Sequence, residues 1–288
     1  MPLAVISFEF DPVLHLGDLA VRWQTVALAA VVAAALIVAG LVARRTGLRN
    51  DDLVFIVVGI VPGAILGGRI GYALLHLDYY SFAPAALLDP LQGSLELGLA
   101  VVGGSISGAA VAHFLSGNVR RWLDASILPL LLALGAGKLA LVLGGTGQGE
   151  PLDAAWATRY VGAGPWGSLA PGVASIPSQA IEGGATLAIV LAIMLLSSTG
   201  VPARGDGRHF FLGIAGWALV RAIVAATWRD VPIVGQVRAD QLISIAIAAG
   251  AFLAAFLLWK LPRRTPPIDE GVSSETVAWP GRTNEPEV

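Results

Sequence analysis

Residues 53–75 read LVFIVVGIVPGAILGGRIGYALL, and Arg69 is the only charged residue among them. A helix rises about 1.5 Å per residue, so about 20 mainly apolar residues cross the hydrocarbon core of a membrane. The stretch therefore has the length and composition of one crossing. It predicts a transmembrane helix, because lipid offers no hydrogen-bond partners to an open backbone.

Six further stretches share this composition, which predicts an all-α, polytopic bundle. The seven expected spans are residues 25–42, 53–75, 95–115, 122–143, 177–196, 210–227 and 241–259. The whole chain of 288 residues is 56% hydrophobic and only 13% charged, about half the charged share of a soluble domain. We expect a membrane domain over residues 1–262 and a disordered cytoplasmic tail over residues 263–288, which is rich in Pro, Glu and Thr.

Basic residues collect in alternate connections, which predicts the orientation. Eleven lie on one side: Arg44, Arg45, Arg49, Arg120, Arg121, Arg204, Arg208, Lys260, Arg263, Arg264 and Arg282. Four lie on the other: Arg22, Arg159, Arg229 and Arg238. The positive-inside rule then places the N-terminus outside and the C-terminus in the cytoplasm. The first span is expected to be retained, because its basic residues follow the apolar run, unlike those of a signal peptide.

The external connection over residues 144–176 is unusually long and rich in Gly and Pro. Connections of this length are typical of caps and lids over a site, although a peripheral loop at the membrane interface is the alternative. It also carries Trp156, Tyr160 and Trp166. We therefore expect an external cap on the bundle.

Polar residues inside the spans concentrate at one depth. They are the cations Arg69, Lys138 and Arg221, together with Glu96, Gln179, Glu182, Asp240 and Gln241. Counted along each helix, all fall toward the outer ends, and charges within a membrane usually face the bundle or a wet cavity. Three cations against two intramembrane glutamates predict a positive cavity for an anionic headgroup. The alternative is that each charge snorkels or closes a structural pair, such as Arg69 with Glu96 or Arg221 with Glu182.

Other compositional features exclude several classes of function. No Cys is present, so the chain itself has no disulfide, no thiolate metal site and no cysteine nucleophile. The four His lack metal-ligand spacing, so we expect no metal site. Near-neutral charge without a basic run argues against a nucleic-acid partner. Gly59, Gly63, Gly67 and Gly71 recur every fourth residue and predict close approach of a second helix.

Several motifs along the spans resemble the bacterial prolipoprotein diacylglyceryl transferase family. They are Phe10-Asp11-Pro12-Val13, Gly67-Gly68-Arg69-Ile70-Gly71-Tyr72, Gly103-Gly104, Gly135-Ala136-Gly137-Lys138, Pro177-Ser178-Gln179 with Glu182, Gly216 with Arg221, and Gln241-Leu242-Ile243-Ser244. The resemblance implies a plasma-membrane enzyme, without a cofactor, whose site faces the outer leaflet. Such an enzyme transfers diacylglyceryl from phosphatidylglycerol to the lipobox cysteine of a preprolipoprotein and releases glycerol phosphate.

The resemblance also assigns roles to individual residues. Lys138 and Arg221 are expected to bind the phosphate, and Glu182 is expected to assist removal of the proton from the acceptor thiol. The expected substrate-binding residues are Arg69, Gly103, Gly104, Gln179 and Gln241.

Some of the family's polar positions are apolar in this chain, which keeps other interpretations open. The family's His-Gly-Gly is Val102-Gly103-Gly104 here, and the amides and carboxylate that follow the span-four cation are absent after Lys138. One alternative is a non-catalytic paralogue that binds anionic lipid or a membrane partner. Another is a lipid or small-solute transporter, although its polar path would have to continue to the cytoplasmic face.

Overall fold

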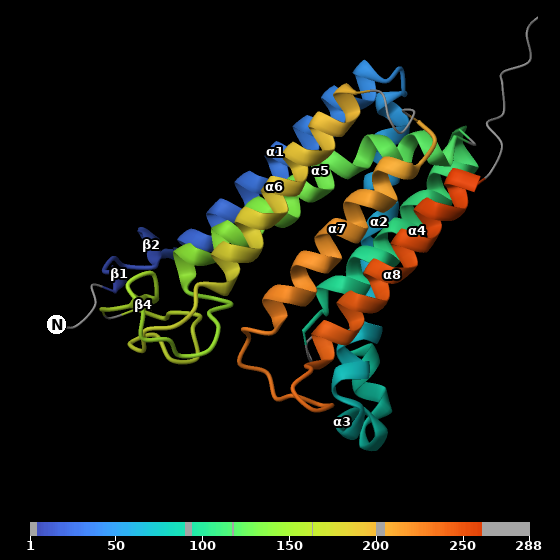
Figure 1. Cartoon of the computed structure of the whole chain (residues 1–288). Coiled ribbons are helices and arrows are strands. Elements are labelled where there is room, and N and C mark those ends of the chain that lie inside the picture. The colour runs from blue at the N-terminus through green and yellow to red at the C-terminus, as the bar shows by residue number, and fades with distance from the viewer. Residues whose placement is uncertain (1–4, 90–93, 117, 163, 200–204, 261–288) are drawn as a thin grey trace, which may run out of the picture.

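The computed structural model describes residues 5–89, 94–116, 118–162, 164–199 and 205–260 (Figure 1). Within these residues, seven helices are long and apolar enough to cross a membrane, which confirms the seven predicted spans. They are α1 (Trp23–Arg45), α2 (Asn50–Leu75), α4 (Leu97–Ser116), α5 (Val119–Ala140), α6 (Ser178–Ser198), α7 (Arg208–Ala225) and α8 (Ala239–Lys260). The predicted tail, residues 263–288, lies outside the described residues.

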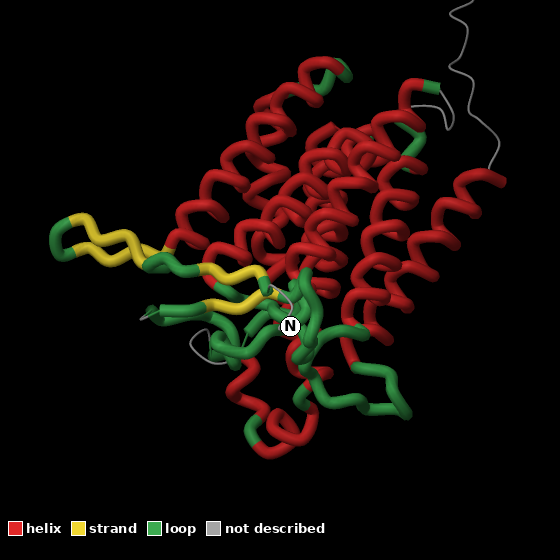
Figure 2. Tube along the Cα trace, turned by 60° about the vertical axis from the view of Figure 1, so that its left-hand side comes forward, coloured by secondary structure: helices red, strands yellow, loops and turns green. Residues whose placement is uncertain are grey.

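Four short strands gather at one end of the bundle, together with the connection between α5 and α6 (Figure 2). Strand β1 (Ile6–Phe8) pairs in parallel with β4 (Thr158–Tyr160), and β2 (Val13–Leu16) pairs antiparallel with β3 (Leu19–Arg22). We call residues 145–177 the lid and this end of the bundle the lid end. The sequence pattern predicted the connection but not the strands, because β1 and β4 are only three residues long, too short for an alternating pattern to stand out.

Three short helical elements complete the described chain. Helix α3 (Leu77–Phe82) and the 3₁₀ turn η1 (Pro84–Leu88) follow α2, and both lie at the lid end (Figure 1). The 3₁₀ turn η2 (Leu141–Gly144) extends α5 toward the lid.

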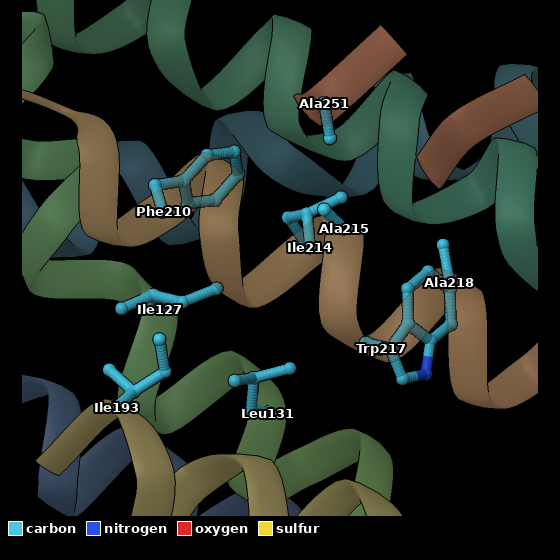
Figure 3. Packing of buried hydrophobic residues seen from close by; sticks show 9 residues of the cluster. All are labelled: Ile127, Leu131, Ile193, Phe210, Ile214, Ala215, Trp217, Ala218 and Ala251. Carbon is cyan, nitrogen blue, oxygen red and sulfur yellow. The ribbon is translucent and has the colours of Figure 1, made fainter. Parts of the chain in front are cut away.

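The helices pack as two groups joined through α7. Helix α5 contacts α1 and α6 on one side of the bundle, while α2 contacts α4 and α7 contacts α8 on the other (Figure 1). Helix α7 also touches α5 and α6, and two-thirds of its apolar span is buried. Trp217 and Ala218 of α7 pack against Leu131 of α5 in the main core (Figure 3). A side chain on the inner face of α7 is therefore shielded from lipid.

Glycines bring α2 and α4 into backbone contact. A Cβ atom at Gly67 would lie 2.2 Å from the carbonyl oxygen of Leu99, and one at Gly103 would lie 2.2 Å from that of Gly63. These distances are far shorter than any real Cβ contact, so only glycine fits at either position. The predicted close approach is confirmed, with α4 as the partner of the α2 stripe.

Replacing Gly67 with alanine is expected to destabilise the protein by about 1–3 kcal/mol, because the new methyl group must push two backbones apart. Thermal unfolding of the purified protein in detergent measures this as a lower Tm. Gly40 of α1 is the matched control, since nothing lies within 4 Å of a Cβ added there. Gly40→Ala should keep or slightly raise the Tm. An unchanged Tm in Gly67→Ala would contradict the backbone contact.

Candidate functional site

Five charged side chains meet at the lid end of the bundle, four of them from α5, α6, α7 and α8 and one from the residue before α4. The guanidinium of Arg221 lies at the centre, with Nη1 3.3 Å from Glu182 Oε1. Its Nη2 donates to both Glu96 Oε1 at 3.2 Å and Asp240 Oδ1 at 3.0 Å. Lys138 Nζ lies 2.7 Å from the other oxygen of Glu182. We call Glu96, Lys138, Glu182, Arg221 and Asp240 the ionic network.

Burial differs across the ionic network. The side chains of Glu182 and Glu96 are 0% and 1% exposed, and that of Arg221 is 5% exposed. Lys138 and Asp240 are more accessible, at 17% and 14%. An incoming molecule therefore meets an ammonium group and a carboxylate first, while the remaining three side chains lie behind them.

Glu96 is held by the start of α4, which begins two residues later than the sequence predicted. Its Oε1 and Oε2 accept hydrogen bonds from the backbone N–H groups of Gly98 and Leu99, at 2.5 and 2.6 Å. Its own N–H donates to the carbonyl of Gly68 on α2. Free N–H groups at a helix N-terminus are favourable partners for a carboxylate, and these hydrogen bonds hold Glu96 in place.

One indole ring packs against both cations. The Trp228 ring centroid lies 4.7 Å from Arg221 Cζ and 5.1 Å from Lys138 Nζ. A cation within about 6 Å of a tryptophan face is attracted by the ring quadrupole. Trp228 follows α7, and its ring holds the two cations side by side. Nothing in the sequence reveals which way this ring turns.

Removing this ring is expected to lower any activity of the site several-fold, because each cation–π contact contributes about 0.5–2 kcal/mol. We expect Trp228→Leu to show the larger loss and Trp228→Phe, which keeps an aromatic face, a smaller one. The half-exposed lid residue Trp156 provides the control, and Trp156→Leu should retain full activity. Equal rates in Trp228→Leu and the parent protein would contradict a role for the ring.

The ionic network carries more negative than positive charge, so the positive excess expected from the sequence is wrong. Arg69 makes no hydrogen bond or ion pair with these five side chains; its Nη2 donates to the backbone carbonyl of Asp89 at 2.5 Å. Asp240 joins instead, so two cations face three carboxylates. The reason is geometric: Arg69 reaches the segment after η1, whereas the first turn of α8 turns Asp240 inward. Of the two structural pairs considered from sequence, Arg221–Glu182 is present and Arg69–Glu96 is not.

The lid contacts α6 one turn before Glu182. Gln179 Nε2 donates to the hydroxyl of Tyr160 at 3.2 Å, and that hydroxyl donates to the carbonyl of Val142 at 2.9 Å. Burial raises the pKa of Tyr160 to about 12, against the opposing effect of the Gln179 hydrogen bond. The phenol therefore keeps its proton at neutral pH. Gln179 Oε1 is buried and has no hydrogen-bond partner among the described residues.

Two arginines fasten the lid to the segment between α7 and α8. Arg229 donates from Nε to the carbonyl of Gly149 at 2.6 Å and from Nη2 to Ser175 Oγ at 2.7 Å. Arg238 forms an ion pair with Glu150 of the lid. These contacts hold the lid across the end of the bundle that carries the ionic network.

The other residues predicted for the site lie outside the network. Gly103 packs against α2, and Gly104 contacts Ile60 of the same helix. Gln241 accepts from the N–H of Arg238 at 2.9 Å and donates to the carbonyl of Ala222 at 3.2 Å, so it joins α8 to α7. Among the described residues, no group of three or more His, Asp or Glu side chains is placed to hold a metal ion.

An apolar cavity of about 440 Å³ lies within the bundle, and none of the five residues of the ionic network lines it. It lies between α1, α2, α4 and α5, and its lining runs from Leu97, the residue after Glu96, to Leu53 and Trp122 near the opposite end of the bundle. Gly104 is also part of this lining. The cavity has the composition of a hydrocarbon-binding site, because no charged residue lines it.

The fold and the site together define a multi-pass membrane protein with a buried ionic network and an apolar cavity between its helices. Comparison with known proteins agrees with this class. A family model described as prolipoprotein diacylglyceryl transferase matches residues 12–258. The chain belongs to this family.

Curated relatives cover most of the chain. A phosphatidylglycerol–prolipoprotein diacylglyceryl transferase of Geobacter sulfurreducens is 30% identical over 220 residues, which are 75% of this chain and 81% of that protein. A protein of the same name from Trichormus variabilis is 24% identical over 275 residues, 92% of this chain and 95% of the relative. A third, from Clostridioides difficile, is 23% identical over 218 residues, 76% and 83% of the two chains.

Proposed function

We propose that this chain transfers the diacylglyceryl group of phosphatidylglycerol to the lipobox cysteine of a prolipoprotein, at the outer leaflet of the plasma membrane. Family membership supports the reaction, and the loop charges predict that the lid end faces outward. The observation that carries the proposal is the ionic network, whose five charges come from α5, α6, α7, α8 and the residue before α4.

The phosphate is assigned to the two cations. Lys138 is the more accessible of them and binds a phosphate oxygen as a point charge. Arg221, behind it, stabilises the negative charge that gathers on the leaving phosphate. Because both are already positioned before the lipid arrives, little reorganisation is needed during the reaction.

Glu182 contributes differently from the role expected from the sequence. Both of its oxygens face cations, Oε1 toward Arg221 and Oε2 toward Lys138, and its side chain is fully buried. A carboxylate in this position has no access to a thiol. We therefore assign Glu182 to positioning Lys138 and Arg221, while Gln179, one turn earlier, joins the same face of α6 to the lid.

The cavity accounts for the lipid portion of the donor. With the phosphate at the ionic network, the glycerol backbone lies near Leu97 and an acyl chain extends along α1, α2, α4 and α5. Burial of an acyl chain is favourable by about 0.8 kcal/mol per CH₂ relative to water, but not relative to lipid, so the cavity orients the donor more than it attracts it.

The proposal is tested by release of glycerol phosphate from phosphatidylglycerol vesicles that contain the purified protein and a synthetic lipobox peptide. We expect release with the cysteine peptide and none with its serine counterpart. In phosphatidylcholine vesicles the cysteine peptide should gain no diacylglyceryl group. A family member of known activity serves as the positive control. Failure to release glycerol phosphate while that control is active would overturn the proposal.

A non-catalytic lipid-binding role is the second candidate. It is favoured by the ion pair between Arg221 and Glu182, because each of these side chains already has a partner in the protein. It predicts that phosphatidylglycerol raises the Tm of the protein without any turnover. Turnover in the vesicle assay would exclude this role.

A further inference from the structure

The three carboxylates of the ionic network differ in what they can still accept. Both oxygens of Glu96 accept backbone N–H groups, and both oxygens of Glu182 face cations. Asp240 uses only Oδ1, which accepts from Arg221. Within the described residues its Oδ2 makes no hydrogen bond or ion pair, and its side chain is the most exposed of the three at 14%. Asp240 therefore keeps one oxygen available to an incoming molecule.

We propose that Asp240 is the general base that removes the proton from the acceptor thiol. The inference rests on the proposed function and adds the proton acceptor that it lacks. The S–H bond of the peptide cysteine breaks and its proton moves to Asp240 Oδ2. The thiolate attacks the diacylglyceryl CH₂ carbon, an S–C bond forms, and the C–O bond to phosphate breaks with its electron pair left on the phosphate oxygen. Glycerol phosphate leaves, and Asp240 then returns its proton to water.

Position on the first turn of α8 explains how Asp240 serves this step. Arg221 Nη2 forms ion pairs with both Asp240 and Glu96. A proton on Asp240 therefore weakens one of the two ion pairs of Nη2. The network changes from one excess negative charge to neutral when the proton arrives. Arg221 is then more strongly attracted to the phosphate at the moment when negative charge develops there. Proton transfer and leaving-group stabilisation are thus coupled through one guanidinium.

Other described groups with proton-accepting chemistry are less suited. Tyr160 has its pKa raised to about 12 by burial and donates to Val142. His76 is stacked on Tyr72 and bonded to its carbonyl, and His209 lies beside Asp124 at the opposite end of α7.

The test compares Asp240→Asn with the parent protein in full-length, vesicle-bound form. Asparagine keeps the size of the side chain and an oxygen for Arg221, but it accepts no proton. We expect kcat to fall at least about 100-fold at neutral pH with little change in KM. Asp153→Asn, which alters an exposed lid carboxylate, should leave kcat unchanged.

Two further readouts separate a base from a structural residue. The Asp240→Asn rate should recover as the pH rises past the thiol pKa of about 8.5, where the substrate ionises without help. A selenocysteine peptide, whose selenol is more acidic, should restore turnover at neutral pH. The charged groups around Asp240 are Arg221, Lys138, Glu96 and Asp230, and all are retained in this variant.

A second variant keeps the proposal testable if Asp240→Asn does not fold. Asp240→Ala opens space for added formate, which should restore part of the rate as a replacement base. If neither variant folds, the parent protein should lose activity in acid with the cysteine peptide but keep it with the selenocysteine peptide.

Different outcomes separate the two proposals. No turnover in the parent protein overturns the proposed function and this inference with it. Parent turnover with full kcat in Asp240→Asn, loss without rescue by pH, selenol or formate, or the same acid dependence for both peptides overturns the inference alone.

Discussion

Arg221→Ala is expected to abolish measurable transfer, with a loss of at least about 1,000-fold, and to lower the Tm as well. Arg221 is 5% exposed and contacts three carboxylates, so its removal leaves Lys138 alone against all three. Removing one partner of a buried ion pair typically costs about 3–5 kcal/mol because the remaining charge is uncompensated. Transition-state stabilisation of the phosphate is lost in the same change.

Arg221→Lys separates charge from geometry. A lysine retains the positive charge but cannot present the planar fork that contacts Glu96, Glu182 and Asp240 together. We expect most of the stability to return and activity to remain well below that of the parent. Arg44→Ala, at the exposed end of α1, is the control for loss of an arginine and should match the parent in both measurements. Full transfer by Arg221→Ala would remove Arg221 from the mechanism.

A charge-matched pair of substitutions distinguishes the catalytic role of Lys138 from its structural one. Lys138→Met removes the cation that pairs with Glu182 Oε2 and leaves Arg221 against three carboxylates. We therefore expect a lower Tm and at least about a 100-fold loss of transfer. Adding Glu182→Gln returns the network to one excess negative charge, as in the parent. The double variant should recover much of the Tm but none of the activity.

Thermal unfolding and the glycerol phosphate assay measure the two quantities separately. Recovery of stability without activity, with Glu182→Gln alone still active, would show that Lys138 acts on the substrate and not only on Glu182. Recovery of both would contradict the assignment of phosphate binding to Lys138. No recovery of stability would contradict the account of Lys138 and Glu182 as a buried pair whose charges depend on each other.

The sequence predicted the helices well because the length and apolar content of a span are local properties. It also predicted that Lys138, Glu182 and Arg221 lie at one depth, since depth follows from counting residues along each helix. The structure brings these three together. Rotation of each helix about its axis is not encoded locally, so the direction of Arg69 and the inward turn of Asp240 could not be derived.

Contacts that depend on where a helix begins or ends were the least predictable. Glu96 was placed inside a span, but α4 begins at Leu97 and makes Glu96 its N-terminal anchor. Trp228 follows the end of α7, and its ring lies against two cations. A shift of one residue at a helix end changes which side chains reach the site. The sequence therefore predicted the depth of the site along the helices more accurately than it predicted which residues form the site.

The most direct test of the account is the mass of a lipobox peptide after incubation with the protein in vesicles of phosphatidylglycerol deuterated in its diacylated glycerol. We predict that the fragment containing the cysteine gains the whole diacylglyceryl group with its deuterium. The Arg221→Ala protein should leave the peptide unmodified. An unmodified peptide with the parent protein, while an active family member modifies it in parallel, would contradict the central claim that this ionic network performs diacylglyceryl transfer.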